Sequence, residues 1–131
     1  MNARRRLLKS LLGLAGIGLP AIGATRPARA ILIQRSPIAG FQYHEGERLW
    51  LRLRVGQSLE LVREPANPYD PRAVRIDWHG RKLGYLPRIE NTAVSQMMDR
   101  GERMSARIVR LAESRNPWGR VEVEVGLEIP A

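Results

Sequence analysis

Apolar and polar residues alternate in several short segments of this 131-residue chain, and turn-forming residues separate the segments. In residues 121–129, for example, Val121, Val123 and Val125 alternate with Glu122 and Glu124. An alternation of period two places the two kinds of side chain on opposite faces of a β-strand. Short strands of this kind each bury one face, so the chain is constrained to fold as a small sheet with one apolar side.

The same pattern predicts the positions of the strands. We expect strands at residues 31–41, 58–64, 73–78, 82–86, 103–111 and 121–129. His79 and Gly80 predict a tight hairpin turn, whereas residues 113–119 predict a longer loop. Residues 49–55 alternate leucine with arginine, which fits either a half-buried strand or an extended loop.

One segment has the periodicity of a helix. Its apolar residues recur at helical spacing, at Ile89, Ala93, Met97 and Met98. Asn91 suits the N-cap of this helix, and Gly101 suits its C-terminal end. We expect the two methionines to lie in the core, together with Trp50 and Trp78.

These elements predict a mainly β fold of the α+β class with one or two helices. Five to six short strands in about 100 residues favour a small, strongly curved barrel of the OB type. The chain has no cysteine, which excludes disulfides, thiolate nucleophiles and cysteine zinc sites. The stability of the domain must therefore come from its apolar core.

The first 30 residues have the composition of an export signal. Four basic residues between Arg4 and Lys9 precede an apolar stretch at 11–24, and Ala28-Arg29-Ala30 matches a signal-peptidase site. We expect a signal peptide at residues 1–30, cleavage near Ala30, and one domain at residues 31–131. The adjacent arginines resemble a twin-arginine signal, although Ala3 and Leu7 differ from the usual residues. An apolar stretch of about 14 residues is shorter than the roughly 20 that a membrane span requires.

Export would place the mature domain in the periplasm or outside the cell, with membrane contact only during export. If the signal does not function, the protein stays in the cytoplasm with a basic N-terminal arm. Residues 1–30 carry six basic and no acidic side chains, so cleavage lowers the formal net charge from +9 to +3. A charge this small does not by itself predict a nucleic-acid partner, and any such prediction has to rest on a local site.

The segment Asn67-Pro68-Tyr69-Asp70-Pro71 is the strongest candidate for a local site. Its two prolines restrict the turn and present an aromatic ring beside a carboxylate. Tyr85 on the following hairpin adds a second ring, with Lys82 and Arg88 close to it in the sequence. Two interpretations are open: a turn that only directs the chain, with Asp70 bonded to nearby amides, or the wall of a nucleotide pocket.

Several motifs together resemble the HIRAN domain family over residues 38–111. They are Gly40-Phe41-Gln42-Tyr43 with Gly46, Leu59-Glu60-Leu61-Val62-Arg63-Glu64-Pro65, Asn67-Pro68-Tyr69-Asp70, Ala73-Val74 and Gly84-Tyr85-Leu86-Pro87, followed by a helix into Asp99-Arg100-Gly101. The resemblance implies an OB-like domain that captures the free 3′ end of single-stranded DNA. Such domains are modules of Swi/Snf-type fork-remodelling translocases and also occur as small bacterial proteins.

The resemblance also implies roles for single residues. Tyr43 and Tyr69 would contact the terminal nucleotides, and Asp70 would accept a hydrogen bond from the 3′-hydroxyl. Asn67 would shape the turn or touch the strand end. Gln42 stands where related domains carry a basic residue, and Tyr85 stands where some carry a histidine. We therefore expect weaker attraction for phosphate at Gln42, with Lys82 and Arg88 as compensating cations and Trp118 as a further candidate ring.

The chain lacks the motifs of common catalytic sites. It has no Gly-x-Ser-x-Gly elbow and no glycine-rich phosphate loop, and His44 with its neighbouring glutamates is too few ligands for a metal centre. We predict a monomeric, non-enzymatic module without cofactor or metal, whose partner is single-stranded DNA or an oligonucleotide. The alternative is an exported cell-envelope module whose groove binds a glycan or a protein.

Overall fold

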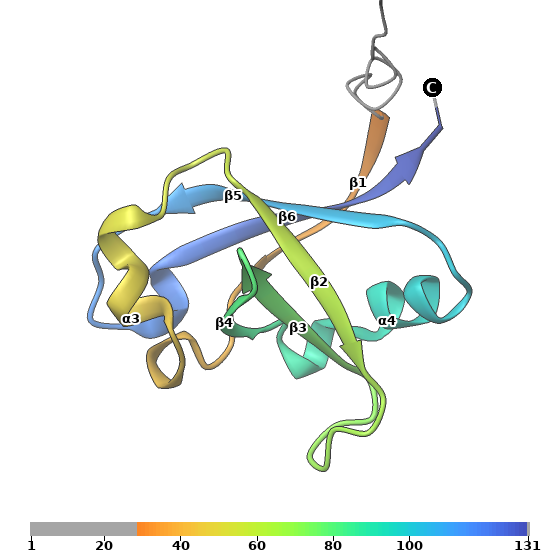
Figure 1. Cartoon of the computed structure of the whole chain (residues 1–131), viewed down its shortest axis with the longest axis horizontal. Helices are drawn as coiled ribbons and strands as arrows, with labels where there is room; N and C mark the ends of the chain where they lie inside the picture. The colour runs from red at the N-terminus through yellow and green to blue at the C-terminus, as the bar shows by residue number, and fades with distance from the viewer. Residues whose placement is uncertain (1–28, 131) are drawn as a thin grey trace, which may run out of the picture. The chain divides into compact units, whose positions relative to one another are not determined.

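The computed structural model describes residues 29–130 and contains one six-stranded sheet. The strands are β1 (Arg29–Pro37), β2 (Ser58–Glu64), β3 (Ala73–Trp78), β4 (Arg81–Tyr85), β5 (Met104–Leu111) and β6 (Val121–Ile129). The helices are α3 (Gly46–Leu49) and α4 (Thr92–Asp99), with short 3₁₀ turns η3 (Phe41–Tyr43), η4 (Trp50–Arg52), η5 (Arg88–Glu90) and η6 (Pro117–Gly119). The α+β, OB-like class predicted from the sequence is confirmed (Figure 1).

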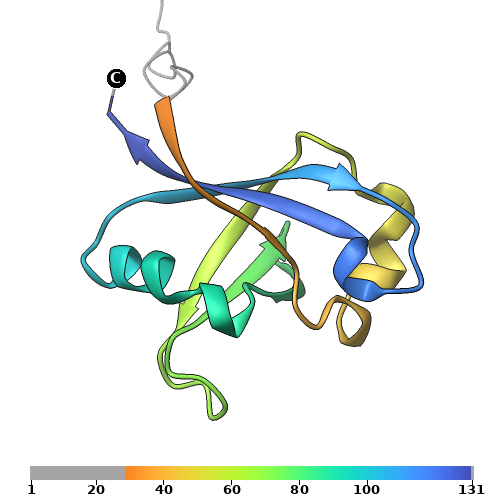
Figure 2. The same ribbon diagram turned by 180° about the vertical axis from the view of Figure 1, so that it is seen from behind.

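The sheet has the strand order β1-β6-β5-β2-β3-β4. Neighbours in the series β6-β5-β2-β3-β4 pair antiparallel, and the pairs β3–β4 and β5–β6 each contain a shift of register. Such bulges bend a strand and increase its twist. Figure 2 shows the resulting curvature from behind, with β1 crossing the long β5–β6 hairpin.

The curved sheet is closed by a contact between its first and last strands. Two residues after β1, Ala39 exchanges two backbone hydrogen bonds with Tyr85 at the end of β4, at 2.8 and 3.0 Å. Gly84 makes this approach feasible, because a Cβ at that position would lie 2.4 Å from the carbonyl oxygen of Ala39. Its φ of 154° is also in the region that favours glycine. Pairing the two edges completes a barrel.

The interior of the barrel is filled by aliphatic residues and two buried aromatic side chains, Phe41 and Trp78. Phe41, Val74, Ile76 and Ile108 are fully enclosed, and they belong to a single cluster with the valines of β6. Trp78 is buried, while Trp50 and Met98 pack against the cluster from its rim. The core expected from the alternating strands is therefore present.

The sequence predicted either a strand or an extended loop at residues 49–55. Both predictions are wrong, because most of the segment is helical. α3 and η4 occupy most of it, and only Leu53 onward is extended. Leu49 and Leu53 are buried, whereas Leu51 between them is 81% exposed. The buried leucines thus have the four-residue spacing of a helix. In the sequence, exposed Leu51 and the alternating Arg52 and Arg54 give the appearance of a strand period.

The end of β1 and the buried face of the predicted helix also differ from expectation. β1 ends at Pro37, four residues early, because the chain turns into η3. The helical period is shifted, since Val94 and Ser95 face the core while Ile89 lies outside the helix and is 93% exposed. Asn91 does occupy the N-cap position, but its side chain forms no cap hydrogen bond.

The predicted signal peptide lies outside the described residues, except for Arg29 and Ala30. Ala30–Ile129 forms one compact unit. Within residues 29–130, no helix has the length and apolar character needed to cross a bilayer.

We predict that Gly84→Ala lowers the free energy of unfolding by more than about 3 kcal/mol, because the added methyl group would push apart the strands that close the barrel. Urea unfolding of purified protein measures this loss. Gly101→Ala is the matched control. Gly101 also has a positive φ, but no atom lies within 4 Å of its Cβ position, so about 1 kcal/mol is expected. Equal losses in the two variants would contradict the closure argument.

Candidate nucleic-acid interface

A pocket of about 800 Å³ lies between the β2–β3 connection and the end of β4. The connection, residues 65–72, extends beyond the strands that it joins (Figure 1). Six of the eight predicted site residues line this pocket: Asn67, Tyr69, Asp70, Lys82, Tyr85 and Arg88. The structure therefore brings together residues from three separate stretches of the sequence.

Asn67 organises the turn that forms one wall of the pocket. Its Oδ1 accepts hydrogen bonds from the backbone amides of Tyr69, at 2.8 Å, and Asp70, at 3.1 Å. An asparagine that bonds the amide two residues ahead mimics a backbone turn. With the flanking prolines, these bonds hold the ring of Tyr69 in the solvent, where it is 82% exposed.

Asp70 is directed inward from the same turn and is only 9% exposed. Its Oδ1 accepts a hydrogen bond from the amide of Arg72, and its Oδ2 accepts one from Nδ2 of Asn91, at 2.8 Å. Burial by itself raises the pKa of Asp70, but these two hydrogen bonds and the nearby Arg88 outweigh it and hold the pKa below its ordinary value. Asp70 is thus an ionised structural acceptor that also reaches the pocket wall.

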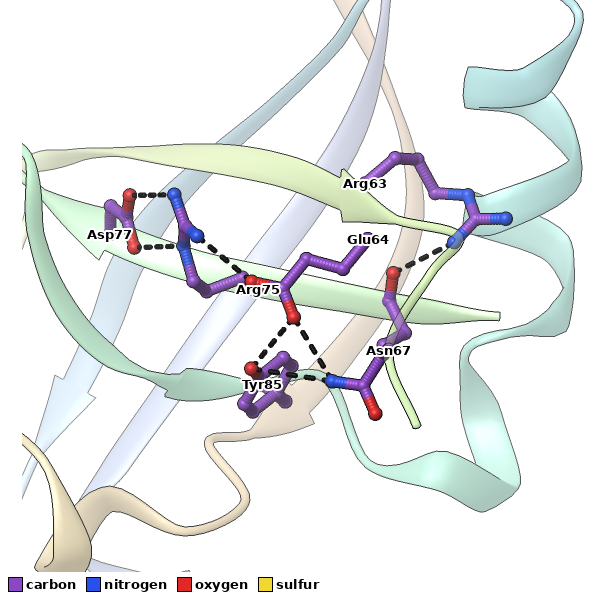
Figure 3. Close-up of polar contacts among 7 residues, drawn as sticks. Arg63, Glu64, Asn67, Arg75, Asp77 and Tyr85 are labelled. Carbon is purple, nitrogen blue, oxygen red and sulfur yellow. Dashed lines mark hydrogen bonds and ion pairs between the residues drawn. The ribbon is translucent and has the colours of Figure 1, made fainter. Parts of the chain in front are cut away.

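Glu64, at the end of β2, connects the two walls. Its Oε1 accepts hydrogen bonds from the Tyr85 hydroxyl, at 2.8 Å, and from Nδ2 of Asn67, at 3.0 Å. Its Oε2 forms an ion pair with Arg75 at 2.8 Å (Figure 3). Burial raises the pKa of Glu64, yet the bonds from Asn67, Tyr85 and Arg75 together hold the pKa below 4.5.

Two arginines extend this polar network on either side. Arg75 also forms paired hydrogen bonds with Asp77, at 2.9 and 3.0 Å (Figure 3). Arg63 donates to the carbonyls of Ala73 and Pro71 and pairs with Asp99 of α4. The turn is therefore attached both to the sheet and to the helix, so its shape is set before any ligand binds.

The second wall of the pocket carries Tyr85, Lys82 and His44. Nζ of Lys82 lies 4.6 Å from the centre of the Tyr85 ring, which is a cation–π distance. The ring of His44 stands edge-on to Tyr85, with centroids 6.2 Å apart. Tyr85 is therefore held by three neighbours, including Glu64 at its hydroxyl, and it presents less free ring surface than Tyr69.

Two predicted site residues do not line the pocket. Tyr43 and Gln42 lie on η3, where the Tyr43 ring is 78% exposed and Oε1 of Gln42 is buried without a hydrogen-bond partner among residues 29–130. η3 contacts both β4 and η6, the turn that carries Trp118. Tyr43 and the half-exposed Trp118 thus belong to neighbouring turns outside the main pocket.

Two pocket residues were missed as site residues by the sequence reasoning. Glu64 was interpreted only as part of a strand motif, and His44 only as an incomplete metal ligand. Both line the pocket, and no group of three or more metal-ligating side chains occurs in residues 29–130. The arrangement of rings, cations and acceptors suits non-covalent recognition of a flat ring joined to an anion.

These features define a class of protein: a small, closed β-barrel with a pocket beside one loop. The HIRAN domain profile matches residues 31–129. The chain belongs to the HIRAN domain family, and HIRAN domains are in general DNA-binding modules rather than catalysts.

Comparison with individual proteins agrees with this family. A crystal structure of a Lactobacillus plantarum protein superposes with a TM-score of 0.67 at 26% identity, covering 79% of this chain and 100% of the other. The HIRAN domain of human HLTF superposes with a TM-score of 0.58 at 19% identity, covering 76% of this chain and 78% of that one. The similarity to the HLTF domain supports the fold of this chain.

A larger relative shares part of the sequence. A Fanconi-associated nuclease 1 homolog from Oryza sativa subsp. japonica is 31% identical over 88 residues, which is 64% of this chain. The chain spans only 8% of the length of that relative.

We predict that Glu64→Gln lowers the free energy of unfolding at neutral pH by about 1–2 kcal/mol, because charge-assisted bonds from Tyr85 and Arg75 are weakened. The pKa of Glu64 is lower in the folded state than in the unfolded state, so its contribution is present above about pH 4.5 and is lost as the pH falls below that value. Urea unfolding at several pH values should show the difference from wild type shrinking in acid. Glu113→Gln, an exposed carboxylate in the loop after β5, is the control and should show no such trend.

Proposed function

We propose that this domain binds single-stranded DNA and captures its 3′ end. The observation that carries the proposal is the pocket itself, where an exposed ring, two cations and an ordered acceptor converge. Lys82 lies over the Tyr85 ring and Arg88 lies near Asp70; both line the pocket, where their charges can attract phosphates. The family supports DNA as the ligand class.

Each part of the pocket has a physical role in this proposal. Stacking of a base on Tyr69 contributes about 1–3 kcal/mol and tolerates any base. Lys82 and Arg88 attract the phosphates on either side of that base. Binding of this kind gives affinity without reading sequence, and it weakens as salt concentration rises.

Selectivity for a free end is assigned to Asp70. Each oxygen of its carboxylate accepts one hydrogen bond from the protein, and a carboxylate oxygen has capacity for two. A 3′-hydroxyl can donate to the remaining capacity, whereas a 3′-phosphate is repelled by the negative charge. The ionised state of Asp70 at neutral pH is part of this argument.

The polar network behind the pocket contributes by holding the site in one shape. Asn67 and Tyr85 are both fixed by Glu64, and Asp70 is fixed by Asn91. A site that is ordered before binding loses less conformational entropy when the ligand arrives. The tyrosine ring of Tyr69 has only two rotatable bonds, which keeps this cost small.

We predict that the mature domain binds a short oligothymidine with a free 3′-hydroxyl more tightly than the same strand with a 3′-phosphate. Fluorescence anisotropy in low salt measures both affinities. Tyr69→Ala should weaken binding about 5- to 100-fold and leave the melting temperature unchanged, since its ring is mostly exposed.

Two variants distinguish the parts of the site. Arg88→Ala should lower the slope of log K against log salt by about 0.7, and Asp70→Asn should remove the preference for the hydroxyl. Arg103→Ala, an exposed cation on the β5 side, is the control and should change neither quantity. No binding of either strand in low salt would contradict the proposal and favour a glycan or protein ligand.

We further propose that residues 1–30 direct export and are removed near Ala30. The compact unit begins at Ala30, and the first residues of β1 are exposed, so cleavage there leaves the core intact. N-terminal sequencing of protein from the periplasm of an expression host should show Ile31 as the first residue. Replacement of Arg4, Arg5 and Arg6 by lysine should block export if the twin-arginine route is used.

A further inference from the structure

Charged side chains of both signs line the pocket. Two carboxylates, Glu64 and Asp70, line it beside two cations, Lys82 and Arg88. Gln42 offers no positive charge, and its amide oxygen is buried on η3. Glu64 is already paired with Arg75, so the remaining groups give a polyanion only a small net positive charge, and its phosphates need a local contact.

His44 occupies the position from which such a contact is available. It lines the pocket, and the edge-on contact with Tyr85 sets its ring on the same wall as Lys82. The backbone is also held there, because the amide of Glu45 donates to the carbonyl of Lys82 at 3.0 Å. No hydrogen bond to the protein occupies either ring nitrogen within residues 29–130.

We propose that His44 and Lys82 form a phosphate-binding subsite beside Tyr85, and that protonation of His44 strengthens it. This inference rests on the proposed binding of single-stranded DNA and identifies where one backbone phosphate lies. Lys82 supplies a constant positive charge, while the imidazole adds a neutral donor at high pH and a second positive charge at low pH.

The groups that face His44 determine the direction of the pH dependence. Lys82 on β4 is the nearest charge, and Glu64, Asp70 and Arg88 are the other charged groups of the pocket. Tyr85 is neutral and is bonded to Glu64, while Glu45 is paired with Arg81 and Arg48. Burial and then the charge of Lys82 lower the pKa of His44 below 6.5.

A bound phosphate counteracts part of this lowering of the His44 pKa. Its negative charge offsets Lys82 and favours the imidazolium, so the pKa of His44 is higher in the complex than in the free protein. By linkage, the complex takes up a proton as the pH falls through the pKa of His44, and its affinity increases. The carboxylates of the pocket titrate only at lower pH, since the pKa values of Glu64 and Asp70 are held below their ordinary values.

The experiment compares binding of oligothymidine at about pH 8 and about pH 5.5, because thymine does not titrate in that range while histidine does. We expect wild-type affinity to increase about three- to fivefold on acidification, and the salt slope to increase by about 0.7 at low pH. His44→Gln keeps a neutral donor and should lose both changes. The titration of His44 followed by NMR should also move to higher pH when the strand is added.

The second histidine of the chain gives a matched control. His79 lies in the β3–β4 turn, has a positive φ of 48° and is exposed. His79→Asn suits that backbone conformation and removes an imidazole that does not line the pocket, so the pH dependence should remain as in wild type.

The outcomes separate the subsite from the proposed function. Strand binding that is equally pH-dependent in wild type and His44→Gln would overturn the subsite and leave the proposed function standing. Binding of the DNA strand by wild type without any pH dependence would also overturn the subsite and leave the proposed function standing. Absence of strand binding at both pH values would overturn both proposals.

Discussion

The backbone bridge between Ala39 and Tyr85 is the contact on which the site depends. It joins the chain after β1 to the end of β4 and so closes the sheet. Pairing of β4 with β3 places Tyr85 beside the β2–β3 connection, and the bridge brings the segment that carries His44 alongside Lys82. Without a glycine at position 84 the two backbones could not approach each other. One steric requirement therefore supports both the barrel and the pocket.

The polar residues of the pocket both hold its structure and line it. Glu64 and Asp70 are ionised acceptors that hold the turn, and both reach the pocket. A buried polar group is stable only when its hydrogen bonds are satisfied, so such a network favours a single arrangement. The two interpretations of the Asn67–Asp70 turn, as a chain-directing element and as a pocket wall, are compatible for this reason.

The N-terminal segment and the family membership point to different surroundings. HIRAN domains are in general DNA-binding modules, whereas residues 1–30 have the composition of an export signal. A shared fold does not determine the ligand. The features that bear on the ligand are therefore those of the pocket: the exposed ring of Tyr69, the available cations and the imidazole of His44.

The sequence by itself determined the local elements and the position of the main turn. β2, β3 and β6 begin and end where alternation predicts, because strand periodicity and turn chemistry depend on adjacent residues. Residues 49–55 were mispredicted since burial, not alternation, decides their conformation. Only the tertiary structure showed that Glu64 bonds Tyr85 and that Asn91 bonds Asp70, each pair 21 positions apart. The pairing of β2, β3 and β4 and the return of the chain after β4 create these contacts, and no local pattern encodes them.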